Sequence, residues 1–284
     1  MTIYEKPPIV HMKDVEYVYS NGTVALQAIN LSISKGELLA IMGKNGAGKT
    51  TLIRSLNGLI RPTNGNVYIR GENTRQKSIA ELSKSIGIVF QNPHHQLFSN
   101  TVEDEIKFSL KNSKFDREEI DGKILETIEK FRLEKFKNRS PLTLSGGETK
   151  KLAIASILCR DTDLLVFDEP TLGQDAKEIA FFLDLIKYEL TKGKTIIIVT
   201  HNVEFAIENI PRTILMADGK IIADGPTKNV LIKPFLTERT SLILPQVCQL
   251  KLALKASGIQ CPPEIQTKGE MIRFLTSYLN DRIS

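Results

Sequence analysis

The fold is decided by Gly43-Lys44-Asn45-Gly46-Ala47-Gly48-Lys49-Thr50, which matches the phosphate-binding pattern G-x-x-x-x-G-K-[ST]. The loop follows Leu38–Met42, an apolar run that predicts a buried strand, and it opens a predicted helix over residues 49–59. Glycines let backbone N–H groups turn toward phosphate oxygens, and the start of a helix adds positive potential there. Strand, loop and helix in this order predict an α/β fold that binds the phosphates of a nucleotide.

Each residue type in the loop has an expected task. Lys49 is expected to reach the β and γ phosphates, and Thr50 is expected to hold Mg²⁺. A chance match to the pattern occurs in roughly one chain in a hundred of this length, given that about 7% of residues are glycine. The residues expected to contact the nucleotide here are Gly43, Asn45, Gly46, Ala47, Gly48, Lys49, Thr50 and Thr51.

A second apolar run, over residues 164–167, ends abruptly in the two carboxylates of Asp168 and Glu169. Burying such charges inside a sheet is costly, so they are expected at its carboxyl edge, where open α/β sheets bind ligands. Asp168 is predicted to support Mg²⁺, directly or through water. Glu169 is predicted to orient and deprotonate the attacking water.

Periodicity along the chain predicts the remaining architecture. Residues 101–140 are charged and have a helical period, which predicts an inserted helical subdomain. Apolar, β-branched runs predict a sheet covered on both faces by helices, with antiparallel strands near the N-terminus. These runs are residues 26–33, 38–42, 66–69, 86–90, 164–167 and 195–200, and a hairpin-like stretch covers residues 220–223.

The last part of the chain has a different character. A turn-like Gly225-Pro226 is a plausible boundary, and apolar residues at helical spacing follow it: Val247, Leu250, Leu254, then Ile272, Leu275 and Leu279. Residues 226–284 hold eight Lys/Arg against four Asp/Glu, so most of the net charge of +5 lies there. Such a small excess is usual for a solvated surface, and nucleic acid is not expected as a partner.

The apolar runs are far shorter than the roughly 20 residues that a membrane-spanning helix needs. The first residues lack the apolar core of a secretory signal, so the protein is expected in the cytoplasm. Cys159, Cys248 and Cys261 are widely spaced, with no CxxC pair, and are interpreted as reduced and structural.

Leu144-Ser145-Gly146-Gly147-Glu148, the signature segment, lies just before a predicted helix, so its N–H groups form a second anion-binding helix start. Its position between the phosphate loop and the acidic strand resembles the signature of ABC ATPases. The resemblance covers about residues 7–225. It implies that Tyr19 stacks on adenine, that Gln91 meets Mg²⁺ and the membrane subunits, that Asp175 is the D-loop aspartate, and that His201 contacts the γ-phosphate.

A finer resemblance lies in Gln91-Asn92-Pro93-His94-His95-Gln96-Leu97-Phe98 and in residues 101–106. These stretches are similar to the ATPases of energy-coupling factor (ECF) importers, which take up vitamins or transition-metal ions such as cobalt and nickel. Some sixty residues after the catalytic core fit the same group. The sequence departs from the family in three features: Glu148 replaces the common Gln, Lys150-Lys151 replaces Gln-Arg, and the D-loop segment, residues 172–176, does not end in Leu-Asp-Pro.

The resemblance implies a P-loop NTPase of the ABC ATPase type with an antiparallel β subdomain. Residues 1–225 are expected to form the nucleotide-binding domain, with a helical subdomain at about 92–160, and residues 226–284 a small helical extension. The implied protein is an ATP- and Mg²⁺-dependent ATPase with Glu169, His201 and Gln91 as catalytic residues and Thr50, Gln91 and Asp168 on Mg²⁺. Ser145, Gly146 and Gly147 are expected on the nucleotide of a second subunit, identical or related, in a head-to-tail dimer.

That dimer is expected to dock on integral membrane subunits at the cytoplasmic face of the membrane. A non-transport ABC protein of DNA maintenance or translation is the main rival from another class. It is disfavoured because only 95 residues lead from Thr50 to Ser145, which leaves no room for a long coiled coil, and because the motifs occur once. The motor of another ABC importer or of an exporter is the nearest alternative. A GTPase or kinase would not explain the signature segment.

Overall fold

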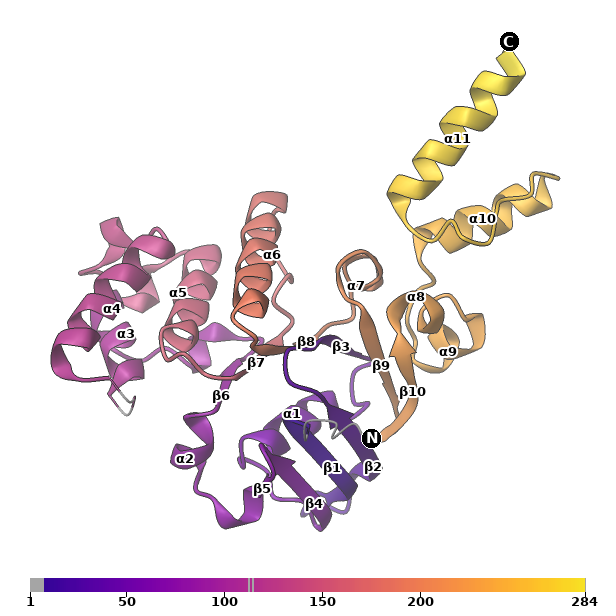
Figure 1. Cartoon of the computed structure of the whole chain (residues 1–284). Coiled ribbons are helices and arrows are strands. Elements are labelled where there is room, and N and C mark those ends of the chain that lie inside the picture. Colours follow the sequence, from indigo (N-terminus) through magenta and orange to yellow (C-terminus); the bar gives the residue numbers. More distant parts are fainter. Residues whose placement is uncertain (1–7, 112, 114, 284) are drawn as a thin grey trace, which may run out of the picture. The chain divides into compact units, whose positions relative to one another are not determined.

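The structure is a computed structural model that describes residues 8–111, 113 and 115–283 (Figure 1). It divides into two compact units, which are described separately. The first unit is made of residues up to 38 and residues 50–199, and the second of residues 39–49 and 200–284.

The first unit contains an antiparallel sheet of the order β2-β1-β4-β5. Its strands are β1 (Val10–Val18), β2 (Val24–Ile33), β4 (Asn64–Ile69) and β5 (Glu72–Asn73). The antiparallel strands predicted near the N-terminus are therefore confirmed, and β1 is an addition that the sequence did not predict. Its apolar residues alternate only irregularly because the pairing of β1 with β2 shifts register at several points.

Three parallel strands, β6 (Ile86–Val89), β7 (Leu164–Asp168) and β8 (Thr195–Val199), form the core of the same unit, with β7 between the other two. Every residue of these strands is buried. Such continuous apolar runs are typical of parallel strands that are covered on both faces. Phe167 packs edge to face on Phe182 of α6 (Ala176–Thr191), with ring centroids 5.2 Å apart.

The predicted helical insertion is present as α3 (Val102–Leu110), α4 (Arg117–Lys130) and α5 (Gly146–Leu158). All six apolar residues that defined its helical period are buried: Val102, Ile106, Leu110, Ile124, Ile128 and Phe131. Helix α1 (Lys49–Leu56) is shorter than predicted, because the left-handed Gly58, with φ of +75°, ends the helical path. The unit also holds α2 (Ile79–Ser83) and short 3₁₀ turns at Thr74–Gln76, Pro93–His95, Glu134–Phe136 and Pro141–Thr143.

A buried ion-pair network ties α4 to α6 and to the chain before β8. Glu189 is 2% exposed and lies 3.0 Å from Lys194 and 3.2 Å from Lys130. Burial alone would raise the pKa of Glu189, but the hydrogen bond and charge of Lys194, with the charge of Lys130, lower it below its ordinary value. The carboxylate therefore stays ionised inside the fold.

The second unit pairs β3 (Leu38–Met42) in parallel with β9 (Arg212–Ala217), which turns at Asp218-Gly219 into the antiparallel β10 (Lys220–Pro226). The predicted hairpin is confirmed, whereas β9 itself was not predicted. Helix α7 (Val203–Asn209) precedes β9, and helices α8 (Thr227–Val230) and α9 (Pro234–Arg239) follow β10.

In the tail, residues 226–284, the apolar residues at helical spacing lie on two helices, α10 (Gln246–Ala256) and α11 (Lys268–Ile283) (Figure 1). Val247, Ile265 and Met271 form a small buried cluster between them. The apolar stripe is buried only in part, since Ile272 is 64% exposed and Leu279 is 54% exposed.

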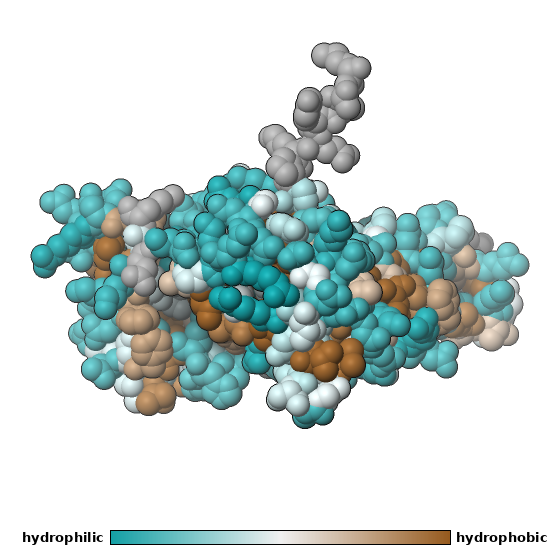
Figure 2. Space-filling model, turned by 90° about the horizontal axis from the view of Figure 1, so that it is seen from below, coloured by the Kyte–Doolittle hydropathy of each residue, from teal (hydrophilic) through white to brown (hydrophobic). Residues whose placement is uncertain are grey.

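Figure 2 shows one face of the whole molecule, which is mainly hydrophilic and on which hydrophobic residues gather in separate small patches.

Within the described part of the chain, no helix combines the length and the apolar character needed to cross a membrane.

The three cysteines are free thiols, as predicted. Burial raises the pKa of the Cys159 thiol to about 12, which makes that side chain an unreactive part of the core.

Candidate functional site

The phosphate loop starts where β3 ends in the second unit. Gly43, Gly46 and Gly48 have φ values of +148°, +79° and +100°, which residues with a side chain rarely adopt. A Cβ atom on Gly43 would overlap the carbonyl oxygen of Met216 on β9. The ammonium group of Lys49 donates to the carbonyls of Gly43 at 2.6 Å and Lys44 at 3.0 Å. Lys49 therefore lies over the loop that it is predicted to serve.

The outer side of the loop is fastened to the β9–β10 hairpin. Lys44 forms an ion pair of 2.9 Å with Asp218, and the N–H of Gly219 donates to the carbonyl of Ala47 at 3.2 Å. The hydrogen bond and charge of Lys44 lower the pKa of Asp218. These contacts hold the loop against the hairpin, which favours a preformed cradle over one that orders on binding.

His201 emerges near the same strand end. It follows Thr200, whose N–H donates at 3.2 Å to the carbonyl of Ile41, one residue before β3 ends. His201 is exposed, and the next residue, Asn202, caps the start of α7. The second unit thus brings His201 and the phosphate loop to one end of β3.

The first unit holds the acidic strand end. Asp168 and Glu169 are each only 7% exposed. Glu169 adopts a φ of +50°, in the left-handed region, and its N–H donates to the carbonyl of Val199 at 2.8 Å. A strained, buried carboxylate at the carboxyl end of a parallel strand is typical of a functional residue.

Two other predicted nucleotide contacts lie together in this unit. The hydroxyl of Tyr19 lies 2.9 Å from Oγ1 of Thr51 on α1. Tyr19 is 37% exposed and packs edge to face on Tyr17. A half-exposed aromatic ring held in place by a hydrogen bond and a second ring can serve as a stacking platform for a flat base.

The signature segment forms the start of α5, as predicted. Ser145 is its N-cap, and Glu148 completes a capping box: its carboxylate accepts the N–H of Ser145 at 2.9 Å. Hydrogen bonds from the backbone and side chain of Ser145 lower the pKa of Glu148. Glu148 therefore has a structural reason to stand where the family commonly has Gln, since either residue type can close such a box.

The predicted D-loop aspartate is also a helix cap. Asp175 accepts the N–H of Glu178 at 2.8 Å at the start of α6. The carboxylate of Glu178 lies so close to the signature segment that a Cβ on Gly147 would overlap it. The signature segment therefore packs on the first turn of α6, the helix that follows the D-loop segment.

Gln91 is exposed and comes two residues after β6 ends. Further along this loop, the side chain of Gln96 accepts the N–H of Phe90 at 3.3 Å. The loop is therefore anchored behind Gln91, which leaves the predicted glutamine available at the surface.

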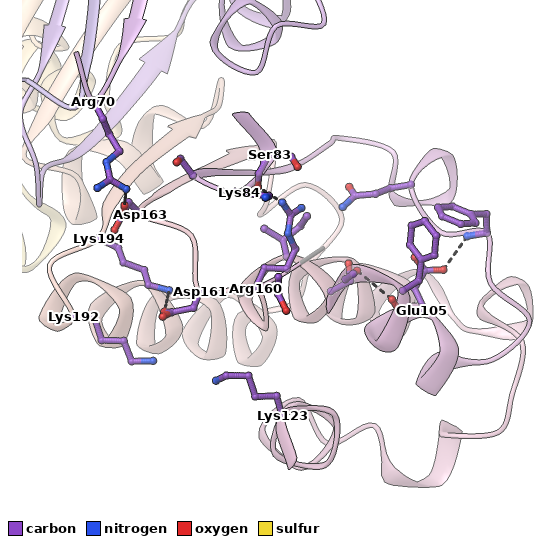
Figure 3. Close-up of a pocket in the computed structure, with 18 residues that line it drawn as sticks. Arg70, Ser83, Lys84, Glu105, Lys123, Arg160, Asp161, Asp163, Lys192 and Lys194 are labelled. Carbon is purple, nitrogen blue, oxygen red and sulfur yellow. Dashed lines mark hydrogen bonds and ion pairs between the residues drawn. The ribbon is translucent and has the colours of Figure 1, made fainter. Parts of the chain in front are cut away.

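A pocket of about 1000 Å³ lies elsewhere in the first unit (Figure 3). Its lining includes Ser85, Asp163 and Lys194, which directly precede β6, β7 and β8. It thus borders the amino ends of the strands, opposite the edge that carries Glu169, and is not the nucleotide site. Figure 3 shows Lys123 and Lys192 reaching toward one another across it. No sequence motif indicated this pocket.

No group of three or more His, Cys, Asp or Glu side chains suited to a metal ion occurs within residues 8–111, 113 and 115–283. A hydroxyl and a carboxylate, such as those of Thr50 and Asp168, form a donor set for Mg²⁺ that phosphate oxygens and water complete. The described residues therefore fit a magnesium ion that arrives with a nucleotide.

The fold and these segments define a nucleotide-binding α/β protein of the P-loop class. The chain belongs to the ABC transporter family, whose sequence profile, described as "ABC transporter", matches residues 26–172.

Curated relatives agree with this assignment. The chain is 37% identical to "Energy-coupling factor transporter ATP-binding protein EcfA" of Methanocaldococcus jannaschii, over 96% of this chain and 99% of that protein. It is 40% identical to "Putative ABC transporter ATP-binding protein" of Methanosarcina acetivorans, over 95% of this chain but 44% of that protein. The chain therefore spans less than half the length of some curated relatives that it matches.

Solved structures also resemble it. The cbiO1 subunit of Clostridium perfringens, described as part of the ABC transporter complex cbiONQ, is 33% identical with a TM-score of 0.72, over 86% of this chain and 98% of that one. A dimeric ATP-binding cassette in a post-hydrolysis state, bound to ADP and Pi, is 31% identical with a TM-score of 0.70, over 77% of this chain and 98% of that one.

Proposed function

We propose that this chain binds and hydrolyses ATP as the motor subunit of an ECF-type ABC importer. The observation that carries the proposal is that a phosphate loop, a strained buried Glu169 and the capped signature segment occur in one chain. Similarity to a protein named EcfA over nearly the full length of both chains supports the ECF type. The proposed cargo is a micronutrient, either a vitamin or a transition-metal ion such as cobalt.

Each site residue has a proposed task. Backbone N–H groups of the loop and Lys49 bind the phosphates, while Thr50, Asp168 and Gln91 hold Mg²⁺, whose charge offsets that of the phosphate oxygens. Glu169 takes the proton of the attacking water.

His201 is proposed to contact the γ-phosphate. Tyr19 stacks on adenine, Thr51 lies beside the phosphates, and Asp175 joins the two halves of the site.

A second ABC ATPase subunit, identical or related, is the proposed partner. Ser145 and Gly146 are exposed at the start of α5, where N–H groups and the helix dipole attract an anion. In a head-to-tail dimer this surface contacts the nucleotide on the other subunit. Integral membrane subunits complete the proposed assembly at the cytoplasmic face, and hydrolysis drives the motion passed to them near Gln91.

Co-purification of the intact membrane assembly tests this function. We expect the full chain, tagged and extracted with mild detergent from cells of its source, to bring along small, very hydrophobic membrane proteins and to hydrolyse ATP in their presence. Recovery with DNA or ribosomes and without membrane proteins would contradict the proposal. Recovery with the large membrane subunits of an exporter would favour the alternative that the chain is the motor of an ABC exporter, which the motifs also allow.

The division of the chain into residues 1–225 and a helical extension at 226–284 remains part of the proposal. Thr227, Leu231 and Leu236, just after the proposed boundary, are buried, and the hydroxyl of Thr227 lies 2.8 Å from that of Thr213 on β9. A cut at residue 225 would strip these contacts from the second unit. A cut after Leu244 keeps α8 and α9 and removes only α10 and α11.

We expect the chain truncated after Leu244 to fold and bind ATP, but to self-associate or pair with a related ATPase subunit more weakly without nucleotide. A short helix pair is marginal in water, and its exposed apolar side chains need another surface. Equilibrium sedimentation measures the change. Ile272→Glu with Leu279→Glu in the full chain is expected to weaken association in the same way, whereas Ser277→Glu, an exposed polar position on α11, is not. Equal association of all these chains would contradict a role for the tail in pairing.

A further inference from the structure

Lys150 is a buried cation that links two functional segments of the first unit. It lies on α5, five residues after Ser145, and is only 6% exposed. Its ammonium group donates to the carbonyl of Glu169 at 3.1 Å and to that of Leu172 at 2.9 Å. Burying an ammonium group is costly unless its donors find acceptors. The helix that begins at the signature segment is thus fastened to the main chain that carries Glu169.

The main chain of Glu169 needs such support because its φ of +50° is strained. A left-handed residue other than glycine is strained and persists only where the surrounding structure holds it. Its N–H donates to Val199, and its carbonyl accepts both the N–H of Leu172 at 3.3 Å and the ammonium of Lys150. Among these bonds, the one from Lys150 is the link made by a side chain.

Electrostatics act on the same group. Burial lowers the pKa of Lys150, while the nearby carboxylates of Glu169 and Glu178 act against that change. Glu178 also lies against Gly147 and 4.0 Å from Lys151. The first turns of α5 therefore contact the first turn of α6 through Glu178, and the buried ammonium of Lys150 contacts the turn that carries Glu169.

We propose that Lys150 is a positioning residue, which holds the main chain of Glu169 so that its carboxylate is aimed at the attacking water. This inference rests on the proposed ATPase function. In the proposed dimer, Ser145 contacts the nucleotide of the partner while Glu169 acts on the nucleotide of its own chain. Lys150 then joins, within one chain, the residues that serve two different ATP molecules.

Lys150→Met tests the proposal because it keeps most of the length of the side chain and removes the donor. Lys151→Met is the matched control, since Lys151 is the adjacent lysine, partly exposed, and lies 4.0 Å from Glu178. We expect Lys150→Met to lower kcat about 10- to 100-fold, because small misplacements of catalytic groups lower reaction rates by that factor. Both chains are assayed in the assembly in which the wild-type chain hydrolyses ATP. KM and equilibrium ATP binding should stay within threefold, and Lys150→Gln, which keeps one amide donor, should fall between Met and wild type.

Hydrogen exchange of the full chain without nucleotide gives an independent readout. Lys150→Met is expected to speed exchange in residues 169–175 and Lys151→Met is not. Equal losses of kcat in both lysine variants, or a kcat within threefold of wild type for Lys150→Met, would overturn the proposal. If Lys150→Met does not fold, Lys150→Gln is judged by the same exchange and by a kcat loss of at least threefold. An inactive wild type would refute the ATPase function itself, while the exchange data would still decide whether Lys150 holds the turn.

Discussion

Glu169→Gln is expected to lower the rate of ATP hydrolysis by about 10²- to 10⁴-fold while Mg-ATP binding stays close to wild type. The substitution removes a general base, and general acid–base catalysis contributes rates of that size. The amide has the same shape as the carboxylate, and the backbone bond from residue 169 to Val199 does not involve the side chain. Steady-state phosphate release and equilibrium binding of a fluorescent ATP analogue measure the two effects.

The same variant is expected to accumulate an ATP-bound dimer, visible by size-exclusion chromatography with Mg-ATP. Asp184→Asn is a suitable control because it makes the same chemical change at an exposed position of α6, where Asp184 forms a surface ion pair of 3.8 Å with Lys187. It should retain normal turnover. Turnover near that of wild type in Glu169→Gln would remove Glu169 from the role of base.

Ser145→Arg is expected to abolish hydrolysis and to leave ATP binding by the isolated chain within about threefold of wild type. The long cation would fill the space where the signature segment is proposed to meet the γ-phosphate of the partner subunit. Loss of the helix cap alone costs only about 1 kcal/mol. Ser145→Ala, which removes the cap without adding bulk, is therefore expected to fold with a slightly lower Tm and to keep a larger share of the activity than Ser145→Arg.

Mixing variants tests whether the site is shared between subunits. Lys49→Ala is expected to weaken ATP binding about 10- to 100-fold, since charge-assisted hydrogen bonds contribute about 1.5–3 kcal/mol. A dimer of Ser145→Arg with Lys49→Ala keeps one intact composite site, made from the phosphate loop of the first chain and the signature segment of the second. Partial recovery of hydrolysis on mixing is the expected result. Complete loss of ATP binding in monomeric Ser145→Arg would contradict the shared site.

Glu148 and Lys150 show how two departures from the family pattern acquire different explanations. Glu148 closes a capping box with Ser145, which lies three residues before it. The nearby sequence is therefore enough to explain why a Glu stands at this position. Lys150 instead meets carbonyls that lie 19 and 22 residues further along the chain. No pattern in the neighbourhood of Lys150 could indicate those partners.

The phosphate loop, the acidic strand end, the signature segment and the helical insertion could all be predicted from the order of the residues. Each is contiguous or periodic, because a loop that cradles phosphate, a buried parallel strand and an amphipathic helix are set by residues close together in the chain. The buried face of α3 and α4 followed for the same reason. Strand β9 was missed, although its run of Thr213 to Ala217 is fully buried, because a short apolar run is not distinguished from a helix by periodicity.

Contacts between residues that are distant in the chain became visible only in the folded structure. It set the carbonyl of Met216 against Gly43, placed Glu189 between Lys130 and Lys194, and aimed Lys150 at the turn of Glu169. These contacts depend on the relative placement of whole strands and helices, which packing of the core fixes after local structure is chosen. A buried charge is tolerated only where that packing supplies its partner, so the pairs could not be read from the order of the residues alone.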